Sequence, residues 1–283
     1  MQHSETTVQS SGGLKLYVQK WQADVPIRSV IAIVHGFGEY GGRYMNLVNH
    51  LVPHGHVLCG IDLRGHGRSP GPRGHIDGWE DYREDLQSLL RWIPTWEPAR
   101  PRFVLGHSMG ALVVMDFALR HPEGLAGAIV SGAPIEPVGV ASPLLVSMAR
   151  MLSRVWPRFS LPLDLETAAL SRDPEVVRAY EEDPLVHGKA TARWGSESLD
   201  TLDWIQEHAS DMHLPLLMIH GGADRINAAE GSRAFFEAVT YPDKELRIYP
   251  EAYHEPHNDL DWEQEARDIE RWIDSHTEEP VTD

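Results

Sequence analysis

The stretch 102-RFVLGHSMGALVVMDFALR-120 decides the fold class. Its first residues form an apolar run of strand length, and the part after Gly110 has the apolar spacing of a buried helix. Ser108 therefore lies on a sharp turn from a strand into a helix, and Gly106 and Gly110 allow the backbone to turn tightly. A serine at this position projects at the carboxyl edge of a sheet, where it can act as a nucleophile. The alternative is a serine that only caps the helix.

The pattern G-x-S-x-G is weak evidence by itself, because it arises by chance in roughly one protein of this length in ten. The strand before it and the helix after it make the inference specific.

Apolar runs of strand length recur on both sides of this stretch. They lie at 14–20, 29–35, 56–63, 102–106, 126–131, 214–220 and 245–249. Segments with helical periodicity, such as 80–96 and 111–121, separate most of them. This alternation predicts an α/β fold with a mostly parallel central sheet flanked by helices. It pauses at 134–213, so we expect a core made of 1–133 and 214–283 and a helical cap, or lid, inserted at 134–213.

Charge and composition exclude several classes of function. The chain has 42 Asp and Glu against 25 Lys and Arg, and its formal charge of -17 repels nucleic acid, so we expect no nucleic acid partner. No apolar run reaches the roughly 18 residues of a membrane span, and the polar N-terminus does not resemble a signal peptide. These features favour a cytoplasmic protein, with export by another route left open. Cys59, the single cysteine, lies in an expected buried strand and cannot form an intramolecular disulfide.

A serine hydroxyl needs a base and an orienting carboxylate to become a nucleophile. Asp224 follows the strand at 214–220 after a Gly-Gly turn, and His254 lies in the loop after the strand at 245–249. The order Ser, Asp, His, with each residue on a loop after a strand, is far more specific than any one of the three. We therefore predict a catalytic triad of Ser108, Asp224 and His254. The alternatives are a Gly-Gly-Asp turn and a solvated surface histidine.

The negative charge that develops on an ester oxygen during attack needs backbone N–H donors. The N–H of Met109 directly follows Ser108 and is the first candidate. The second is expected in the loop after the strand that ends at His35, where 35-HGFGEY-40 supplies glycines that let the backbone approach a substrate. This assigns the second oxyanion donor to Phe37. Such a hydrolysis needs no cofactor, and we expect none.

Six motifs along nearly the whole chain resemble those of a known family. They are 35-HGFGEYGGRY-44, 60-GIDLRGHGRSPGPRGH-75, 106-GHSMGA-111, 183-DPLVHGKATAR-193, 220-HGGADRI-226 and 253-YHEPHND-259. In these motifs the chain resembles the monoacylglycerol lipases and lysophospholipase-like enzymes of the α/β-hydrolase superfamily. The resemblance implies the α/β-hydrolase fold with a helical cap.

The same resemblance implies a pocket for the glycerol end of a substrate. In these lipases, a Glu and an Arg after the first oxyanion residue help to hold glycerol, and the matching positions are Glu39 and Arg43. His257, three residues after His254, matches a residue near the polar head. The alternative for Glu39 and His257 is hydrogen bonding within their loops, and for Arg43 bracing of its loop is favoured.

Three further features of the sequence bear on the site. Ala111 replaces a glycine that is common in the family, but Gly110 remains, so we expect the turn to be kept. Asp62, Arg64 and His66 are expected to cross-link their loop to the core rather than to catalyse. The stretch 254-HEPH-257 only superficially resembles a zinc motif, because it lacks the i,i+4 histidine spacing and contains a proline, so no metal site is predicted.

One apolar stripe predicts an amphipathic helix within the cap. It is made of Leu144, Leu145, Met148, Met151, Leu152 and Val155, and Arg150, Arg154 and Arg158 lie on another side. The stripe either packs on the body of the cap or borders an acyl-chain tunnel and contacts a lipid surface.

The residues and the resemblance together predict a serine esterase that cleaves monoacylglycerols to fatty acid and glycerol through an acyl-enzyme. Its expected partner is a small lipid ester, with transient contact between the cap and a lipid surface. A lysophospholipase or a general carboxylesterase is the alternative among enzymes, and a non-catalytic binding protein is the alternative outside them. Acyl chain length, positional preference and oligomeric state stay open.

Overall fold

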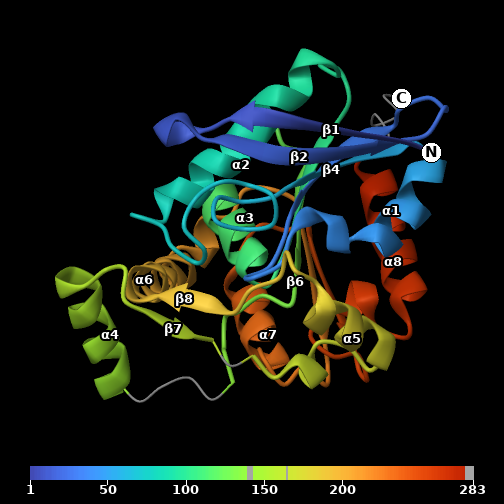
Figure 1. Cartoon of the computed structure of the whole chain (residues 1–283). Coiled ribbons are helices and arrows are strands. Elements are labelled where there is room, and N and C mark those ends of the chain that lie inside the picture. Colours follow the sequence, from blue (N-terminus) through green and yellow to red (C-terminus); the bar gives the residue numbers. More distant parts are fainter. Residues whose placement is uncertain (139–142, 164, 278–283) are drawn as a thin grey trace.

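A central sheet of eight strands organises the molecule (Figure 1). The structure is a computed structural model that describes residues 1–138, 143–163 and 165–277. The strands, in sheet order, are β1 (Gln2–Gln9), β2 (Lys15–Gln22), β4 (His56–Ile61), β3 (Ser29–Val34), β5 (Arg102–His107), β6 (Gly127–Ser131), β9 (Leu216–Gly221) and β10 (Lys244–Tyr249). The strands from β4 to β10 in this order run parallel, whereas β1 and β2 pair in the antiparallel sense. The predicted mostly parallel sheet is confirmed.

The N-terminal strand β1 was not predicted. Seven of its eight residues are exposed, so no apolar alternation marks it in the sequence. It pairs with β2 along its whole length, from Gln2 opposite Gln22 to Gln9 opposite Lys15. Main-chain pairing with a neighbouring strand, rather than burial of side chains, therefore places β1.

Helices cover both faces of the sheet (Figure 1). They are α1 (Met45–Leu51) and α8 (Trp262–Ser275) on one face, and α2 (Glu80–Trp92), α3 (Met109–Arg120) and α7 (Ala229–Ala238) on the other. Strand β3 shows the cause. Ile31 and Ile33 pack in the apolar cluster of α1 and α8, whereas Val30 and Val34 pack in the cluster of α2 and α3. Both faces of β3 are apolar, as expected for a strand covered on both sides.

The segment 134–213, predicted as a cap, contains helices and a small second sheet. Its main elements are α4 (Pro143–Val155), β7 (Ser160–Pro162), α5 (Pro174–Glu182), β8 (Lys189–Thr191) and α6 (Ala192–Glu207). β7 and β8 form an antiparallel pair that the apolar pattern did not indicate. Helix α6 contacts α3 and contributes Leu202 and Ile205 to the larger apolar cluster. The end of the 134–213 segment is thus continuous with the core.

Helix α4 confirms the predicted amphipathic helix, but part of its apolar stripe is uncovered. Met151 and Val155 are 62% and 81% exposed, and Trp156, just after the helix, is 60% exposed. Where α4 meets α6, Arg150 lies 2.8 Å from Asp203. The side chains of Leu144, Leu145 and Met148 lie outside the described residues. Packing of the stripe on the cap is therefore wrong for Met151 and Val155. Within the described ranges, neither α4 nor another helix is long and apolar enough to cross a membrane.

The loop after β4 is held by buried charged groups, as predicted for Asp62 and Arg64. Asp62 accepts hydrogen bonds from the backbone N–H groups of Gly41 at 2.9 Å and Arg68 at 2.8 Å. Arg64 forms an ion pair of 2.6 Å with the fully buried Asp85 on α2. These bonds fix the carboxyl edge of the sheet, where the loops after β3 and β4 start.

Three imidazoles meet between this loop and the 134–213 segment. The ring of His66 lies 5.1 Å from that of His35 and 4.9 Å from that of His187, measured between centroids. His35 Nε2 accepts from the N–H of Leu63, so Nδ1 carries the proton donated to the carbonyl of Gly36. Burial lowers the pKa of His35 and of His187 to about 4, and that of His66 well below its ordinary range. These three side chains are neutral at pH 7.

We expect the free energy of unfolding to decrease between pH 7 and pH 5. Histidines of the unfolded chain become protonated near pH 6.5, whereas His35 in the folded chain has a pKa of about 4 and stays neutral at pH 5. The contribution of this neutral imidazole to the free energy of unfolding is complete above the unfolded pKa and is lost as the pH falls below it. For His35 the loss at pH 5 is about 2 kcal/mol. Urea denaturation at a series of pH values measures it.

The variant His187→Gln is the control, because it removes one imidazole of the three and should make the decrease shallower. A wild-type stability that stays flat between pH 7 and pH 5 would contradict the neutral state of this cluster.

Candidate active site

Ser108 occupies a strained turn between β5 and α3. It has φ 52° and ψ -118°, and it is the only residue other than glycine with a positive φ in the described part of the chain. A Cβ at Gly106 would lie 2.2 Å from the carbonyl oxygen of Gly110, and a Cβ at Gly110 would lie 2.1 Å from that of Val34. Glycine is therefore required at both positions. The turn stores strain at one serine, as often seen at functional sites.

Asp224 and His254 meet at the same edge of the sheet, as predicted. Asp224 follows β9, His254 follows β10, and His254 Nδ1 lies 2.8 Å from Asp224 Oδ2. The other carboxylate oxygen accepts from the backbone N–H groups of Ile226 at 2.7 Å and Asn227 at 3.0 Å. Because the carboxylate only accepts, Nδ1 carries the proton and Nε2 is left to act as a base.

A second imidazole, which the sequence pattern did not predict, lies beside Asp224. His220, near the end of β9, has its Nε2 3.2 Å from Asp224 Oδ2 and 3.0 Å from the carbonyl oxygen of Asn227. Both atoms are acceptors, so Nε2 carries the proton, while Nδ1 lies 2.7 Å from Ser232 Oγ. The i,i+4 spacing in 220-HGGAD-224 was the available signal. Strand periodicity does not show that a side chain near a strand end reaches the following loop.

The ionisation of Asp224 reflects these partners. Burial opposes the charged form, but the charge of His254 and hydrogen bonds from His220, His254 and the Asn227 N–H outweigh it and hold the pKa of Asp224 below its ordinary range. Asp224 is therefore a carboxylate at neutral pH.

The two predicted oxyanion donors lie on adjoining elements. Phe37 is in the loop after β3, and Met109 is the first residue of α3. Neither N–H donates a hydrogen bond to any atom of the residues that the structure describes. The loop is held by Glu39, whose Oε1 accepts from the N–H of Gly36 at 2.6 Å. Both backbone groups are therefore free to bind an oxygen atom of a substrate.

Ser108, His254, Phe37 and Met109 all line one cavity of about 540 Å³. Most of the remaining wall is apolar and comes from both the core and the 134–213 segment. These wall residues include Leu112, Leu163, Leu165, Leu170, Trp194, Leu199, Leu202 and Ile226. The polar side chains of the wall include the carboxyl groups of Glu39 and Glu255 and an ion pair of 3.0 Å between Arg225 and Glu166.

Glu39, Arg43 and Glu255 form a buried cluster at this cavity. Arg43 Nη1 lies 2.6 Å from both Glu39 Oε2 and Glu255 Oε1, and Nη2 lies 2.8 Å from Glu255 Oε2. Burial opposes ionisation of Glu255, but the charge of Arg43 outweighs it and lowers its pKa; burial raises the pKa of Glu39. Sequence reasoning missed Glu255 because its partner Arg43 lies 212 residues away.

Two predicted substrate-binding residues lie behind the cavity wall. Neither Arg43, at the centre of the cluster, nor His257 is among the residues that line the cavity. His257 is buried and stacks on Tyr44 at 4.7 Å, and burial lowers its pKa to about 4. Of the three predicted residues, only Glu39 reaches the cavity.

The 134–213 segment is bonded through the main chain to the loop after β3 and to the loop that contains His254. The N–H of His187 donates to the carbonyl of Gly38 at 2.9 Å. The N–H of His254 donates to the carbonyl of Ala169 at 3.2 Å, and that of Glu255 to Leu170 at 2.8 Å. The ring of Phe37 packs on Trp194, 4.2 Å away. This segment therefore contributes directly to the geometry of the site.

Comparisons with known proteins agree with the fold. Residues 25–261 match the family described as serine aminopeptidase, S33. A monoacylglycerol lipase from Mycolicibacterium smegmatis is 34% identical over 275 residues, which cover 96% of this chain and 98% of that protein.

Among solved structures, the monoacylglycerol lipase of Paleococcus ferrophilus is 34% identical, with a TM-score of 0.84 over 92% of this chain and 99% of that chain. A soluble variant of the Saccharomyces cerevisiae monoglyceride lipase, in complex with a substrate analogue, has a TM-score of 0.85 and 24% identity over 98% and 97% of the two chains, and it supports the fold alone. The chain therefore belongs to the serine aminopeptidase S33 family, and it is a monoacylglycerol lipase-like carboxylic ester hydrolase with the α/β-hydrolase fold.

Proposed function

We propose that the protein hydrolyses monoacylglycerols to fatty acid and glycerol, with Ser108, His254 and Asp224 as its catalytic triad. The observation that carries the proposal is the cavity in which Ser108 and His254 meet an apolar wall, with His254 held by the buried Asp224. The named activity of the relatives supports the same substrate class.

The mechanism follows from these positions. Ser108 Oγ attacks the ester carbonyl while His254 Nε2 takes its proton, and Asp224 holds the Nδ1–H and stabilises the imidazolium. The N–H groups of Phe37 and Met109 bind the oxyanion. His254 then gives the proton to the leaving glycerol oxygen, which breaks the ester bond and leaves an acyl-enzyme. Water, activated by His254, releases the fatty acid and restores Ser108.

The wall of the cavity supports a lipid ester with a neutral head. Leucines and Trp194 suit an acyl chain, whose burial contributes about 0.8 kcal/mol per methylene. Glu39 and Glu255 present carboxyl oxygens that can accept hydrogen bonds from glycerol hydroxyls. Arg43 and His257 are proposed to hold these acceptors in place from behind the wall. A phosphate in the head would meet carboxylates there, which disfavours a lysophospholipase.

We further propose that the 134–213 segment is a cap over a core made of 1–133 and 214–283. Its residues Leu163, Leu170 and Trp194 line the cavity, which supports this division. The exposed Met151, Val155 and Trp156 support transient contact of α4 with a lipid surface.

The variant Ser108→Ala should lose at least about four orders of magnitude in kcat on monoacylglycerols, because it lacks the nucleophile. Fatty acid release is measured on monoacylglycerols, diacylglycerol, lysophosphatidylcholine and short p-nitrophenyl esters, and a fluorophosphonate probe reports covalent labelling. The wild type should hydrolyse monoacylglycerols in preference to the other esters and should be labelled by the probe. The Ser108→Ala variant should show neither hydrolysis nor labelling.

The matched control is Ser198→Ala, because Ser198 lines the same cavity and its hydroxyl is bonded to the carbonyl of Trp194 at 2.8 Å. Activity confined to short esters would reject the substrate assignment and keep the triad. An active Ser108→Ala variant would reject the triad.

The variant His220→Leu should lower kcat by about ten-fold, because Asp224 loses one hydrogen-bond donor, and should leave KM unchanged, because His220 does not line the cavity. The variant His220→Gln retains an N–H donor and should recover much of the loss. Steady-state kinetics of the wild type and the two variants test this positioning role. General destabilisation would lower the concentration of active enzyme, but at equal folded fraction it would not make kcat differ between His220→Leu and His220→Gln. Equal kcat in all three would contradict it.

A further inference from the structure

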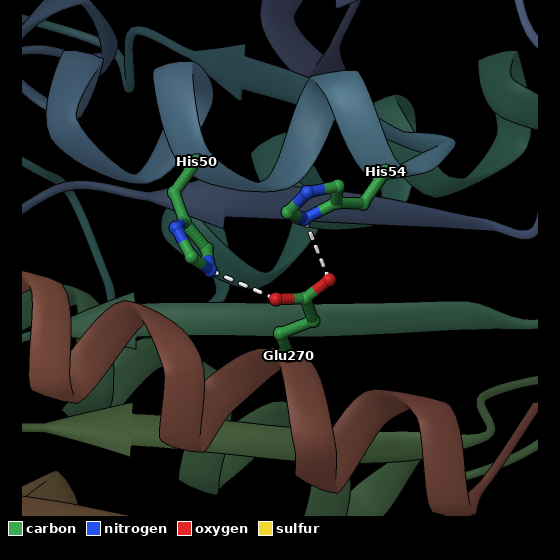
Figure 2. A group of neighbouring side chains, drawn as sticks. All are labelled: His50, His54 and Glu270. Carbon is green, nitrogen blue, oxygen red and sulfur yellow. Dashed lines mark hydrogen bonds and ion pairs between the residues drawn. The ribbon is translucent and has the colours of Figure 1, made fainter.

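A second group of titratable side chains lies on α1, α8 and the turn before β4, near the amino-terminal ends of β3 and β4. His50 is near the end of α1, His54 is in the turn Val52–His54 that follows, and Glu270 is on α8. Figure 2 shows both imidazoles pointing at the carboxylate, each toward a different oxygen. His50 Nε2 lies 2.8 Å from Glu270 Oε2, and His54 Nδ1 lies 2.7 Å from Glu270 Oε1.

The local backbone brings the two histidines to one face. They are four residues apart in 50-HLVPH-54, and Leu51 and Val52, which lie between them, keep right-handed helical angles. Side chains at i and i+4 of a helical segment lie one above the other. Their rings make an edge-to-face contact at 5.4 Å between centroids. The pair is therefore pre-arranged, and α8 supplies the acidic group opposite it.

We propose that His50, His54 and Glu270 bind one zinc ion. Imidazole nitrogen and carboxylate oxygen are preferred zinc ligands, and two histidines with one carboxylate make a three-ligand site with an open position for water. Ligand atoms around tetrahedral zinc stand about 3.3 Å apart, given bonds of about 2.0 to 2.1 Å. The three donor atoms already lie within 4.8 Å of one another. Small rotations of the side chains suffice to admit the ion.

The surroundings of the site favour a cation. His54 is 49% exposed, so solvent reaches the site. Asp274, one turn beyond Glu270 on α8, adds a second carboxylate, which pairs with Arg28 at 2.7 Å, and the Nε2 atom of the fully buried His56 lies 3.4 Å from it. The net charge of -17 also raises the local concentration of cations. Alkaline-earth ions are disfavoured, because they require oxygen ligands.

The ion would join two elements that lead away from the active-site loops. Helix α1 follows the loop that contains Glu39 and Arg43, and α8 follows the loop that contains His254 and Glu255. Near the start of these helices, Asn46 Nδ2 donates to the carbonyl of His257 at 3.1 Å. A zinc ion at His50, His54 and Glu270 would fix the same two helices farther along. The site is separate from the reacting atoms, so it stabilises the fold without entering the reaction.

Zinc binding to the chelator-treated full chain tests the proposal, through competition with a coloured zinc chelator and through thermal unfolding. We expect one zinc ion per chain. We also expect a melting temperature raised by about 5 °C or more at a zinc concentration 100-fold above Kd. The same titration with Mg²⁺ should give no shift. Both readouts are independent of ester hydrolysis, so the outcome does not depend on the proposed function.

The variants His54→Asn and Glu270→Gln should each weaken zinc binding at least about ten-fold, and should lose the thermal shift. The matched control is His276→Gln, because His276 is a histidine just after α8 that pairs with one carboxylate, Asp243, at 3.1 Å. It should bind zinc like the wild type. Circular dichroism and melting without metal verify that each variant is folded. No zinc binding, or equal binding by wild type and both site variants, would overturn the proposal and leave two hydrogen bonds that only join the helices.

Discussion

The close approach of α3 to the end of β3 is the constraint on which the site depends. Hydrogen atoms at Gly106 and Gly110 are the only substituents that fit, because a Cβ at either position would overlap a main-chain oxygen. With α3 seated this closely, Ser108 is forced into its strained turn and Met109 faces the loop after β3. The same contact therefore sets the positions of the proposed nucleophile and of both proposed oxyanion donors. No side-chain interaction in the site could compensate for a helix that stood farther from the sheet.

A buried guanidinium provides the second connection. Arg43 lies between Glu39, from the loop after β3, and Glu255, from the loop after β10. These loops carry the proposed oxyanion donor and the proposed base. Their relative position depends on the two ion pairs of Arg43, one with Glu39 and one with Glu255. The Arg43 guanidinium lies behind the wall and pairs with both carboxyl groups, so the part of the wall formed by Glu39 and Glu255 offers acceptors rather than positive charge. A neutral polyol is the head group that suits such a face.

The elements that the sequence predicted are those whose apolar residues follow a strand or helix period or form a continuous apolar run. β3, β5 and β9 are buried along nearly their whole length, and they end near Phe37, Ser108 and Asp224, whereas His254 follows the half-buried β10. The order of these strands was enough to predict that the four residues lie at one edge of the sheet. β1 was missed because main-chain pairing places it, and β7 and β8 because three residues are too few for a period. Glu255 and His220 were missed because their partners are set by tertiary packing. For His257 the opposite holds. The motif predicted a position near the polar head of the substrate, but it did not show that His257 lies behind the cavity wall.

The main-chain bonds from His187, Ala169 and Leu170 to the catalytic loops bear on how a substrate enters. Lifting this part of the 134–213 segment would break three hydrogen bonds, each contributing about 1 kcal/mol, and would release the loops that carry the proposed base and oxyanion donor. The same part of the segment supplies Leu170 and Trp194 to the cavity wall. Opening the cavity on this side and holding the two loops in place are therefore opposing demands on the same three hydrogen bonds.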